Sequence, residues 1–115
     1  MNRSQVLKRV REVHDHCPHC GATEGLQMHH RKNRGMGGRP KNSLDRFDNL
    51  LRICAWLNLQ IEADAALAME AREMGWKLGN WDGFEMPYYD RALCKWFLLT
   101  QDGRKIETTP PMYLI

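Results

Sequence analysis

The chain lacks any hydrophobic run long enough to cross a bilayer. None of its apolar stretches approaches the roughly 18 residues that a transmembrane helix requires. The first 16 residues, MNRSQVLKRVREVHDH, are charged throughout and contain no apolar segment of the kind found in signal peptides. We therefore expect no membrane partner and a cytoplasmic location.

Acidic residues are scarce in one segment of the chain. The formal net charge is only +3, but between His29 and Arg46 there is a single acid, Asp45. Such a positive stripe is expected of a protein that contacts phosphates, although charge runs are also typical of solvated loops. The six cations of this stripe are Arg31, Lys32, Arg34, Arg39, Lys41 and Arg46.

Internal repeats, low-complexity tracts and composition breaks are also absent. The 115 residues are 43% hydrophobic and 27% charged, which is typical of a globular protein with a modest core. We therefore expect a single domain over residues 1–115.

Local patterns predict an α+β fold. An amphipathic helix is expected over residues 4–14, with Ser4 as its N-cap, and a short strand over residues 26–29. Residues 31–43 are loop-like because Gly35, Gly37, Gly38 and Pro40 punctuate them. Within residues 44–54 we expect a helical turn followed by a strand.

The second half of the chain contains the clearest helical pattern. Residues 57–74 are a run of good helix formers that ends at Gly75. Residues 96–100 and 104–108 flank QDG, which predicts a C-terminal β-hairpin. Residues 76–115 contain no recognisable motif, and we expect them either to complete the core or to bind a partner.

Cysteines are few, but two of them are closely spaced. Cys17 and Cys20 form a Cys-Pro-His-Cys motif, and in an intracellular chain this spacing favours metal binding over a disulfide. Structural zinc needs four ligands, so this motif alone supplies half of a site. Cys54 is a candidate third ligand.

A second group of potential ligands lies on the predicted strand and helix. Asn58 and Glu62 are four residues apart and share a helical face. With His29 from the strand they could form a three-ligand site for a divalent cation, whereas His30 would point to the opposite side of the strand. A solvated helix face is the plainer interpretation of Asn58 and Glu62 taken alone.

The order of these motifs resembles the HNH endonuclease family of the His-Me finger (ββα-metal) superfamily. The chain runs CPHC, MHHRKNRGMGG, DNLLRIC and AWLNLQIE, so the resemblance covers about residues 17–75. It implies a ββα-metal core with a treble-clef-like CxxC knuckle, and it leaves residues 76–115 as a C-terminal extension.

The resemblance also implies residue roles. His29 corresponds to a metal ligand, His30 to the general base, and Asn49 to the residue that holds the catalytic loop and so orients the base. Asn58 and Glu62 stand nine and thirteen residues after Asn49, where colicin-type members have histidines. Oxygen ligands favour Mg²⁺ or Mn²⁺, with Zn²⁺ or Ni²⁺ as alternatives. Asp48 or Asp64 would replace one of them if the alignment is shifted.

The knuckle departs from the family pattern. Members with CxxC often carry a second CxxC, but here Leu57 stands where the fourth cysteine belongs. Cys17, Cys20 and Cys54 would then bind structural zinc with a fourth ligand from elsewhere, or remain a reduced cluster without metal. The candidates for that fourth ligand are Cys94, His16 and His14.

The leading hypothesis from the sequence is a metal-dependent DNA endonuclease that hydrolyses phosphodiester bonds. Arg31, Lys32 and Arg34 would contact the backbone of double-stranded DNA. Small free-standing members with a pair like Gly75-Trp76 resemble proteins encoded by bacteriophages or prophages, some of which act beside the phage terminase. The alternatives are a catalytically inactive nucleic-acid-binding module on the same fold, and an interaction protein that uses its C-terminal hairpin as a contact surface.

Overall fold

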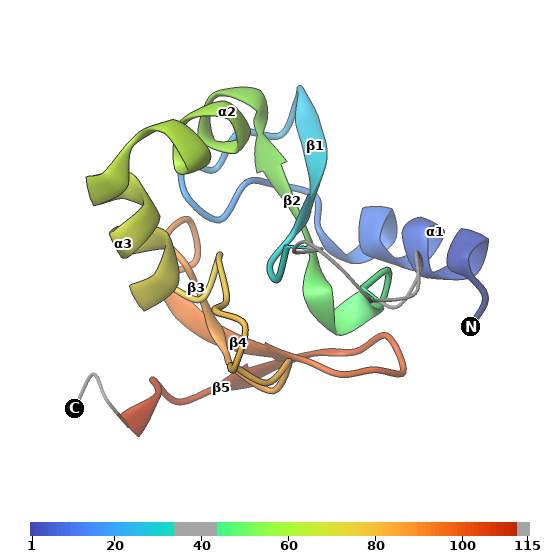
Figure 1. Cartoon of the computed structure of the whole chain (residues 1–115). Coiled ribbons are helices and arrows are strands. Elements are labelled where there is room, and N and C mark those ends of the chain that lie inside the picture. The colour runs from blue at the N-terminus through green and yellow to red at the C-terminus, as the bar shows by residue number, and fades with distance from the viewer. Residues whose placement is uncertain (34–43, 113–115) are drawn as a thin grey trace.

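The computed structural model describes residues 1–33 and 44–112 (Figure 1). Within them it shows a compact α+β fold, as the sequence predicts, and this fold has three α-helices and two small antiparallel sheets. The elements are α1 (Arg3–Val13), β1 (Leu26–His30), the 3-10 helix η1 (Phe47–Asn49), β2 (Leu50–Cys54), α2 (Ala55–Ala63), α3 (Ala65–Glu73), β3 (Tyr88–Asp90), β4 (Lys95–Leu99) and β5 (Lys105–Thr108). No helix in the described ranges is both long and apolar enough to span a membrane.

Helix α1 begins at a capping box. The Asn2 side chain accepts a hydrogen bond from the Gln5 backbone N–H at 2.9 Å, and the Gln5 side chain accepts one from the Asn2 N–H at 2.8 Å. The predicted helix is confirmed, but the prediction of Ser4 as its N-cap is wrong. The helix begins at Arg3, and the N-cap is Asn2, two residues before Ser4. Val6 and Val10 point from this helix into the core.

Strands β1 and β2 form an antiparallel hairpin that leads directly into α2. In the register, Leu26 lies opposite Cys54 at one end and His30 lies opposite Leu50 at the other. Helix α2 starts at the residue after Cys54 and contacts both strands. The hairpin therefore has a cysteine end, where α2 begins, and a histidine end, where η1 enters β2.

The long helix expected over residues 57–74 is two helices, so that prediction is wrong. Asp64 breaks it with extended backbone angles (φ −112°, ψ 114°), and its side chain accepts hydrogen bonds from the N–H groups of Ala66 and Leu67 at 2.9 and 3.2 Å. Aspartate competes well for an N-cap position, and here it caps α3 instead of continuing α2. The chain turns at this point, as Figure 1 shows.

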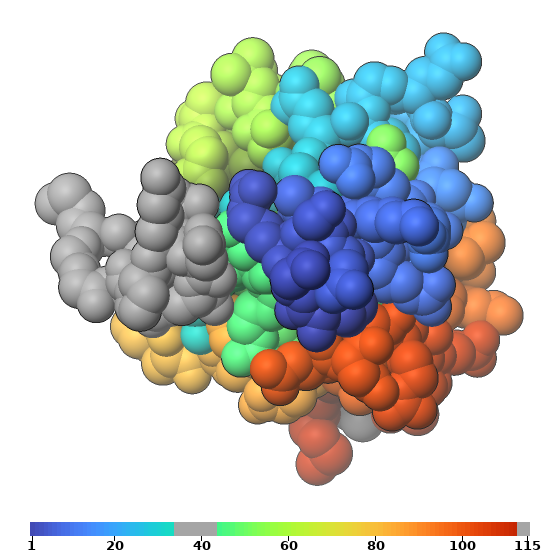
Figure 2. All heavy atoms as spheres, turned by 90° about the vertical axis from the view of Figure 1, so that its right-hand side faces the viewer, coloured from blue at the N-terminus to red at the C-terminus, as the bar shows by residue number. Residues whose placement is uncertain are grey.

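The C-terminal segment completes the core. Strands β4 and β5 form the predicted hairpin, and β3 adds a third strand beside β4. Trp76, Tyr88, Phe97 and Leu99 are buried in the same apolar cluster as Val10. Figure 2 shows α1 lying over the turn between β4 and β5, where the Arg9 guanidinium donates to the Gly103 carbonyl at 2.9 Å.

Candidate metal and catalytic site

Three cysteines lie close enough to hold a metal ion. The Sγ atoms of Cys17, Cys20 and Cys54 are all within 4.8 Å of one another. A tight turn aims the first two thiols at one point, because the Gly21 N–H donates to the Cys17 carbonyl at 2.8 Å and Gly21 adopts a positive φ of 78°. Cys54 reaches them from the end of β2. The grouping predicted from the sequence is therefore present.

None of the proposed fourth ligands joins this cluster. Both ring nitrogens of His16 are hydrogen-bonded to carboxylates: Nδ1 to Asp15 Oδ1 at 2.7 Å, and Nε2 to Asp90 Oδ2 at 2.6 Å. The His14 ring is buried against Phe47 and Tyr88. The Cys94 thiol is exposed and donates to the Arg91 carbonyl at 3.4 Å. Among the described residues, no further histidine, cysteine or carboxylate completes the set, so these three predictions are wrong.

The thiols of Cys17 and Cys20 differ in their acidity. Burial raises the pKa of Cys17 to about 11, which keeps this thiol protonated in the absence of a cation. Burial also opposes ionisation of Cys20, but hydrogen bonds from the Ala22 N–H and the Cys54 and Cys17 thiols outweigh it and lower the pKa of Cys20. Cys20 therefore ionises more readily than Cys17, and a bound metal would have to displace the proton of Cys17.

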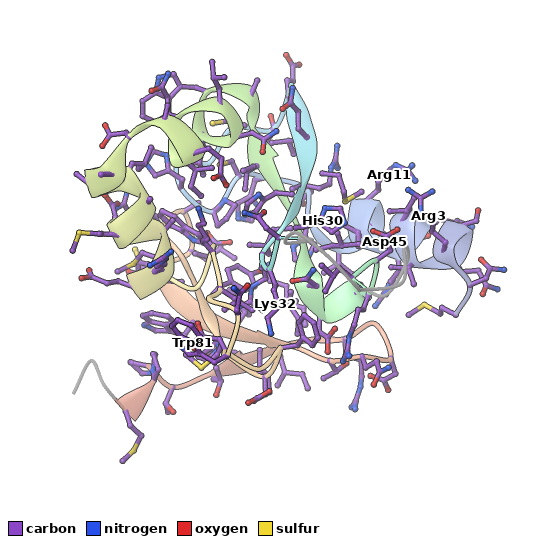
Figure 3. All side chains as sticks on the ribbon, in the orientation of Figure 1. Arg3, Arg11, His30, Lys32, Asp45 and Trp81 are labelled. Carbon is purple, nitrogen blue, oxygen red and sulfur yellow. The ribbon has the colours of Figure 1, made fainter. Side chains whose placement is uncertain are left out.

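At the opposite end of the hairpin, His30 lies in a charged network with Asp45 and Arg3 (Figure 3). The His30 Nε2–H donates to Asp45 Oδ1 at 2.6 Å, and the Arg3 Nε–H donates to Asp45 Oδ2 at 2.9 Å. Burial opposes the charge of Asp45, but these two hydrogen bonds keep its pKa below the usual range. The ionised carboxylate fixes the proton of His30 on Nε2, which leaves Nδ1 as the accepting nitrogen.

Asn49 closes the loop that follows His30. Its side chain is fully buried, accepts from the Lys32 N–H at 2.7 Å and donates to the carbonyls of Lys32 at 3.2 Å and Leu44 at 2.9 Å. These bonds join two residues that are 12 positions apart in the chain, Lys32 and Leu44. Asn49 thus ties together the backbone at Lys32 and at Leu44, and its part in orienting His30 stays a prediction.

His29 points to the other side of β1, toward α2. Its Nε2–H donates to the Trp76 carbonyl at 2.7 Å, and burial lowers the pKa of His29 to about 4. The ring is therefore neutral at pH 7, and because a carbonyl can only accept, its lone pair lies on Nδ1. A histidine whose second nitrogen is fixed by a carbonyl is the arrangement that orients metal-binding imidazoles.

The two predicted ligands on α2 face the same side. Glu62 is close enough that its charge favours protonation of His29, and Asn58 donates to the Gln27 side chain at 2.7 Å, on the strand face that His29 shares. Glu62 itself accepts from Lys77 Nζ at 3.2 and 3.3 Å. Asn58 and Glu62 thus lie on the helix that faces this side of β1, and Lys77 is paired with the Glu62 carboxylate.

The alternative acidic ligands have other roles. Asp48 accepts two hydrogen bonds from the Arg46 guanidinium at 2.7 and 2.8 Å, and Asp64 caps α3. Neither is needed to complete the group around His29.

Two of the predicted DNA contacts are wrong because these side chains are buried. Arg31 is fully buried and donates to the carbonyls of three other segments, and Lys32, which is 7% exposed, donates to the carbonyls of Asn80 and Asp82. Their charge stabilises the interior and is not presented to a phosphate. Arg34, Gly35, Gly37 and Gly38 lie outside the described residues.

Comparison with known proteins adds no relative. No family model, no curated protein and no solved structure matches the chain.

Proposed function

We propose that the protein is a metal-dependent DNA endonuclease of the HNH type, built on a ββα-metal core. The observation that carries this proposal is the pair of histidines on one strand. His30 is polarised by a buried carboxylate, while His29 lies beside Glu62 of the helix that follows the hairpin. In this proposal, a general base at His30 and metal ligands at His29, Asn58 and Glu62 would belong to one hairpin-helix unit.

The catalytic base in this proposal is His30. Asp45 holds its Nε2 proton, so that Nδ1 accepts a proton from the attacking water, and the imidazolium that forms is stabilised by the carboxylate. Arg3 keeps Asp45 ionised and in place, and Asn49 fixes the backbone on both sides of the loop.

The residues that would hold the divalent cation are His29, Asn58 and Glu62. The fit rests on the free Nδ1 of a neutral His29 and on two oxygen donors, a set that favours Mg²⁺ or Mn²⁺. When bound, the cation supplies charge stabilisation at the leaving oxygen of the phosphodiester. Lys77 must leave Glu62 for this to occur. The three cysteines would supply three of the four ligands of a zinc ion at the other end of the hairpin.

A second candidate function is a nucleic-acid-binding module without catalysis. It is favoured by the Lys77–Glu62 ion pair and the Asn58–Gln27 hydrogen bond, which satisfy two of the proposed ligands in the absence of any cation. In that case the basic lysine replaces the metal permanently.

The test is cleavage of supercoiled plasmid with EDTA, Mg²⁺, Mn²⁺, Zn²⁺ or Ni²⁺. We expect metal-dependent nicking that falls by about 10²–10⁴-fold in His30→Ala, since this is the usual contribution of a general base. Glu62→Gln should also lose activity, whereas Glu12→Gln, at an exposed position of α1, serves as the matched control. If the wild type binds DNA but is inert with every metal, the module without catalysis is the correct function.

A further inference from the structure

Trp81 is the most exposed large apolar side chain among the described residues. Its side chain is 90% exposed, although burial of an indole ring would be favourable. Trp81 lies in the segment between α3 and β3, and in Figure 3 Lys32 lies between it and His30. The catalytic hypothesis above does not use it.

The turn that carries Trp81 is held in place. The Gly79 N–H donates to Asp82 Oδ2 at 2.7 Å, and the Asp82 N–H donates to the Gly79 carbonyl at 3.1 Å. Lys32 Nζ donates to the carbonyls of Asn80 and Asp82, which ties the turn to the residues after β1. The indole is thus presented to solvent by a fixed turn, not by a loose one.

A cavity of about 230 Å³ adjoins the indole. Its described lining contains two cations, Arg72 and Lys77, and no carboxylate. No described side chain forms an ion pair with Arg72, so its charge is available to an anion. The lining residues that the structure describes are Asn33, Arg72, Lys77, Leu78, Gly79, Asn80 and Trp81.

The cavity is next to the proposed metal site. Asn33 and Lys77 both line it, and both donate to the Glu62 carboxylate, at 3.4 Å and at 3.2 Å. A ligand in the cavity therefore lies beside the carboxylate that would hold the cation. Its chemistry is an aromatic wall, two amides and two cations around a small volume.

We propose that this cavity binds one unpaired nucleotide of a DNA strand, with its base stacked on Trp81 and its phosphate on Arg72. Aromatic side chains beside cations are the usual platform for single-stranded nucleic acid, because every base has a face that stacks. A base paired within a duplex cannot reach such a cavity. The inference rests on the proposed function in that DNA is the ligand, and it specifies DNA with an unpaired nucleotide as the substrate class.

The experiment measures binding of a labelled single-stranded oligonucleotide, and of its duplex, in EDTA so that no cleavage occurs. Trp81→Ala should weaken single-strand binding roughly tenfold and duplex binding much less, whereas Trp81→Phe should retain most of the affinity. Trp56→Ala is the matched control, since Trp56 is 57% exposed on α2 and outside the cavity. Arg72→Gln should reduce the salt dependence of binding.

Two results would overturn the proposal. One is single-strand affinity that is unchanged in Trp81→Ala, and the other is an equal loss for single strand and duplex. Its failure is distinguishable from failure of the endonuclease proposal, because binding in EDTA does not require catalysis. Trp81-dependent single-strand binding by a protein that cleaves nothing would leave the nucleotide site standing and refute only the nuclease.

Discussion

The two ends of the β1–β2 hairpin are stabilised in different ways. At the histidine end, polar groups are paired within the protein: Asp45 with His30 and Arg3, and Asn49 with the backbone of Lys32. At the cysteine end, three thiols face one another, and Cys54 Sγ accepts only a long 3.4 Å hydrogen bond from the Leu57 N–H.

The difference indicates which end depends on a metal. The histidine end is a closed hydrogen-bond network that forms from protein groups alone. At the cysteine end, a cation would replace weak thiol hydrogen bonds with metal–thiolate bonds, so it would contribute far more there. We therefore expect stability to respond to metal through the cysteines, and catalysis to respond to metal through His29 and Glu62.

The largest expected effect is at the histidine end. Arg31→Met would remove the donor that bonds the carbonyls of Gly75, Asp48 and Met86. Because the Arg31 side chain is buried, water cannot easily replace these hydrogen bonds. We expect a loss of about 3–5 kcal/mol in the free energy of unfolding, measured by urea denaturation. Arg11→Met, on the exposed side of α1, is the control and should change it by less than about 0.5 kcal/mol. Equal effects of the two variants would contradict a structural role for Arg31.

The next prediction concerns the cysteine end. Under reducing conditions, Zn²⁺ at 100 times its dissociation constant should stabilise the protein by about 2.7 kcal/mol, and a chelator should remove this gain. Cys54→Ser should abolish the zinc response, whereas Cys94→Ser, at an exposed cysteine outside the cluster, should keep it. If the melting temperature of the wild type were the same with zinc and with chelator, the cluster would hold no metal.

A third prediction concerns pH, through a buried histidine that packs on Phe47 at the histidine end. Burial lowers the pKa of His14 to about 3, and its Nε2 has no hydrogen-bond partner among the described residues. The unfolded chain therefore binds the proton more tightly, so stability is complete above about pH 6.5 and is lost as pH falls toward 3. His14 should contribute a slope of about 1.4 kcal/mol per pH unit in that window.

The variant that isolates this contribution is His14→Phe, which keeps an aromatic ring against Phe47 and removes the titrating group. Urea denaturation between pH 7 and pH 4.5 should give a shallower slope for the variant than for the wild type. Identical slopes would show that His14 is not the group responsible.

The smallest effect on stability is expected for Arg3. Its side chain is 57% exposed, so Arg3→Gln should cost less than about 1 kcal/mol. Because Arg3 helps to hold Asp45 ionised against His30, metal-dependent cleavage should nevertheless fall severalfold in this variant. Arg9→Gln, on the same helix but bonded to Gly103, should leave the cleavage rate unchanged. A cleavage rate in Arg3→Gln equal to that of the wild type would show that Arg3 does not contribute to catalysis through Asp45.

The sequence predicted the elements of the fold better than their ends. The first helix, the hairpin strands and the C-terminal hairpin all follow from local periodicity and turn residues. The break at Asp64 was missed because alanine, leucine and glutamate on both sides are good helix formers. Only the capping bonds of the Asp64 side chain reveal that two helices meet there.

The candidate site was partly predictable. The histidine pair, Asn49 and the three cysteines carry spacing that can be recognised in the chain, and the structure brings the three cysteine thiols together. The roles of His29, His30 and Asn49 stay predictions. Asp45 and Lys77 could not be found this way. Asp45 was visible only as the single acid in a basic stripe, and the pairing of Lys77 with Glu62 spans 15 residues with no motif.

By itself, the sequence determined the chemistry that is present: two adjacent imidazoles, a thiol cluster and a stripe of positive charge. The tertiary structure decided where that charge is used. Arg31 and Lys32 belong to the stripe, yet both point inward to backbone carbonyls that lie 17 to 55 residues away in the chain. Whether a cation faces solvent or the interior depends on the acceptors that distant segments supply, and no local pattern encodes them.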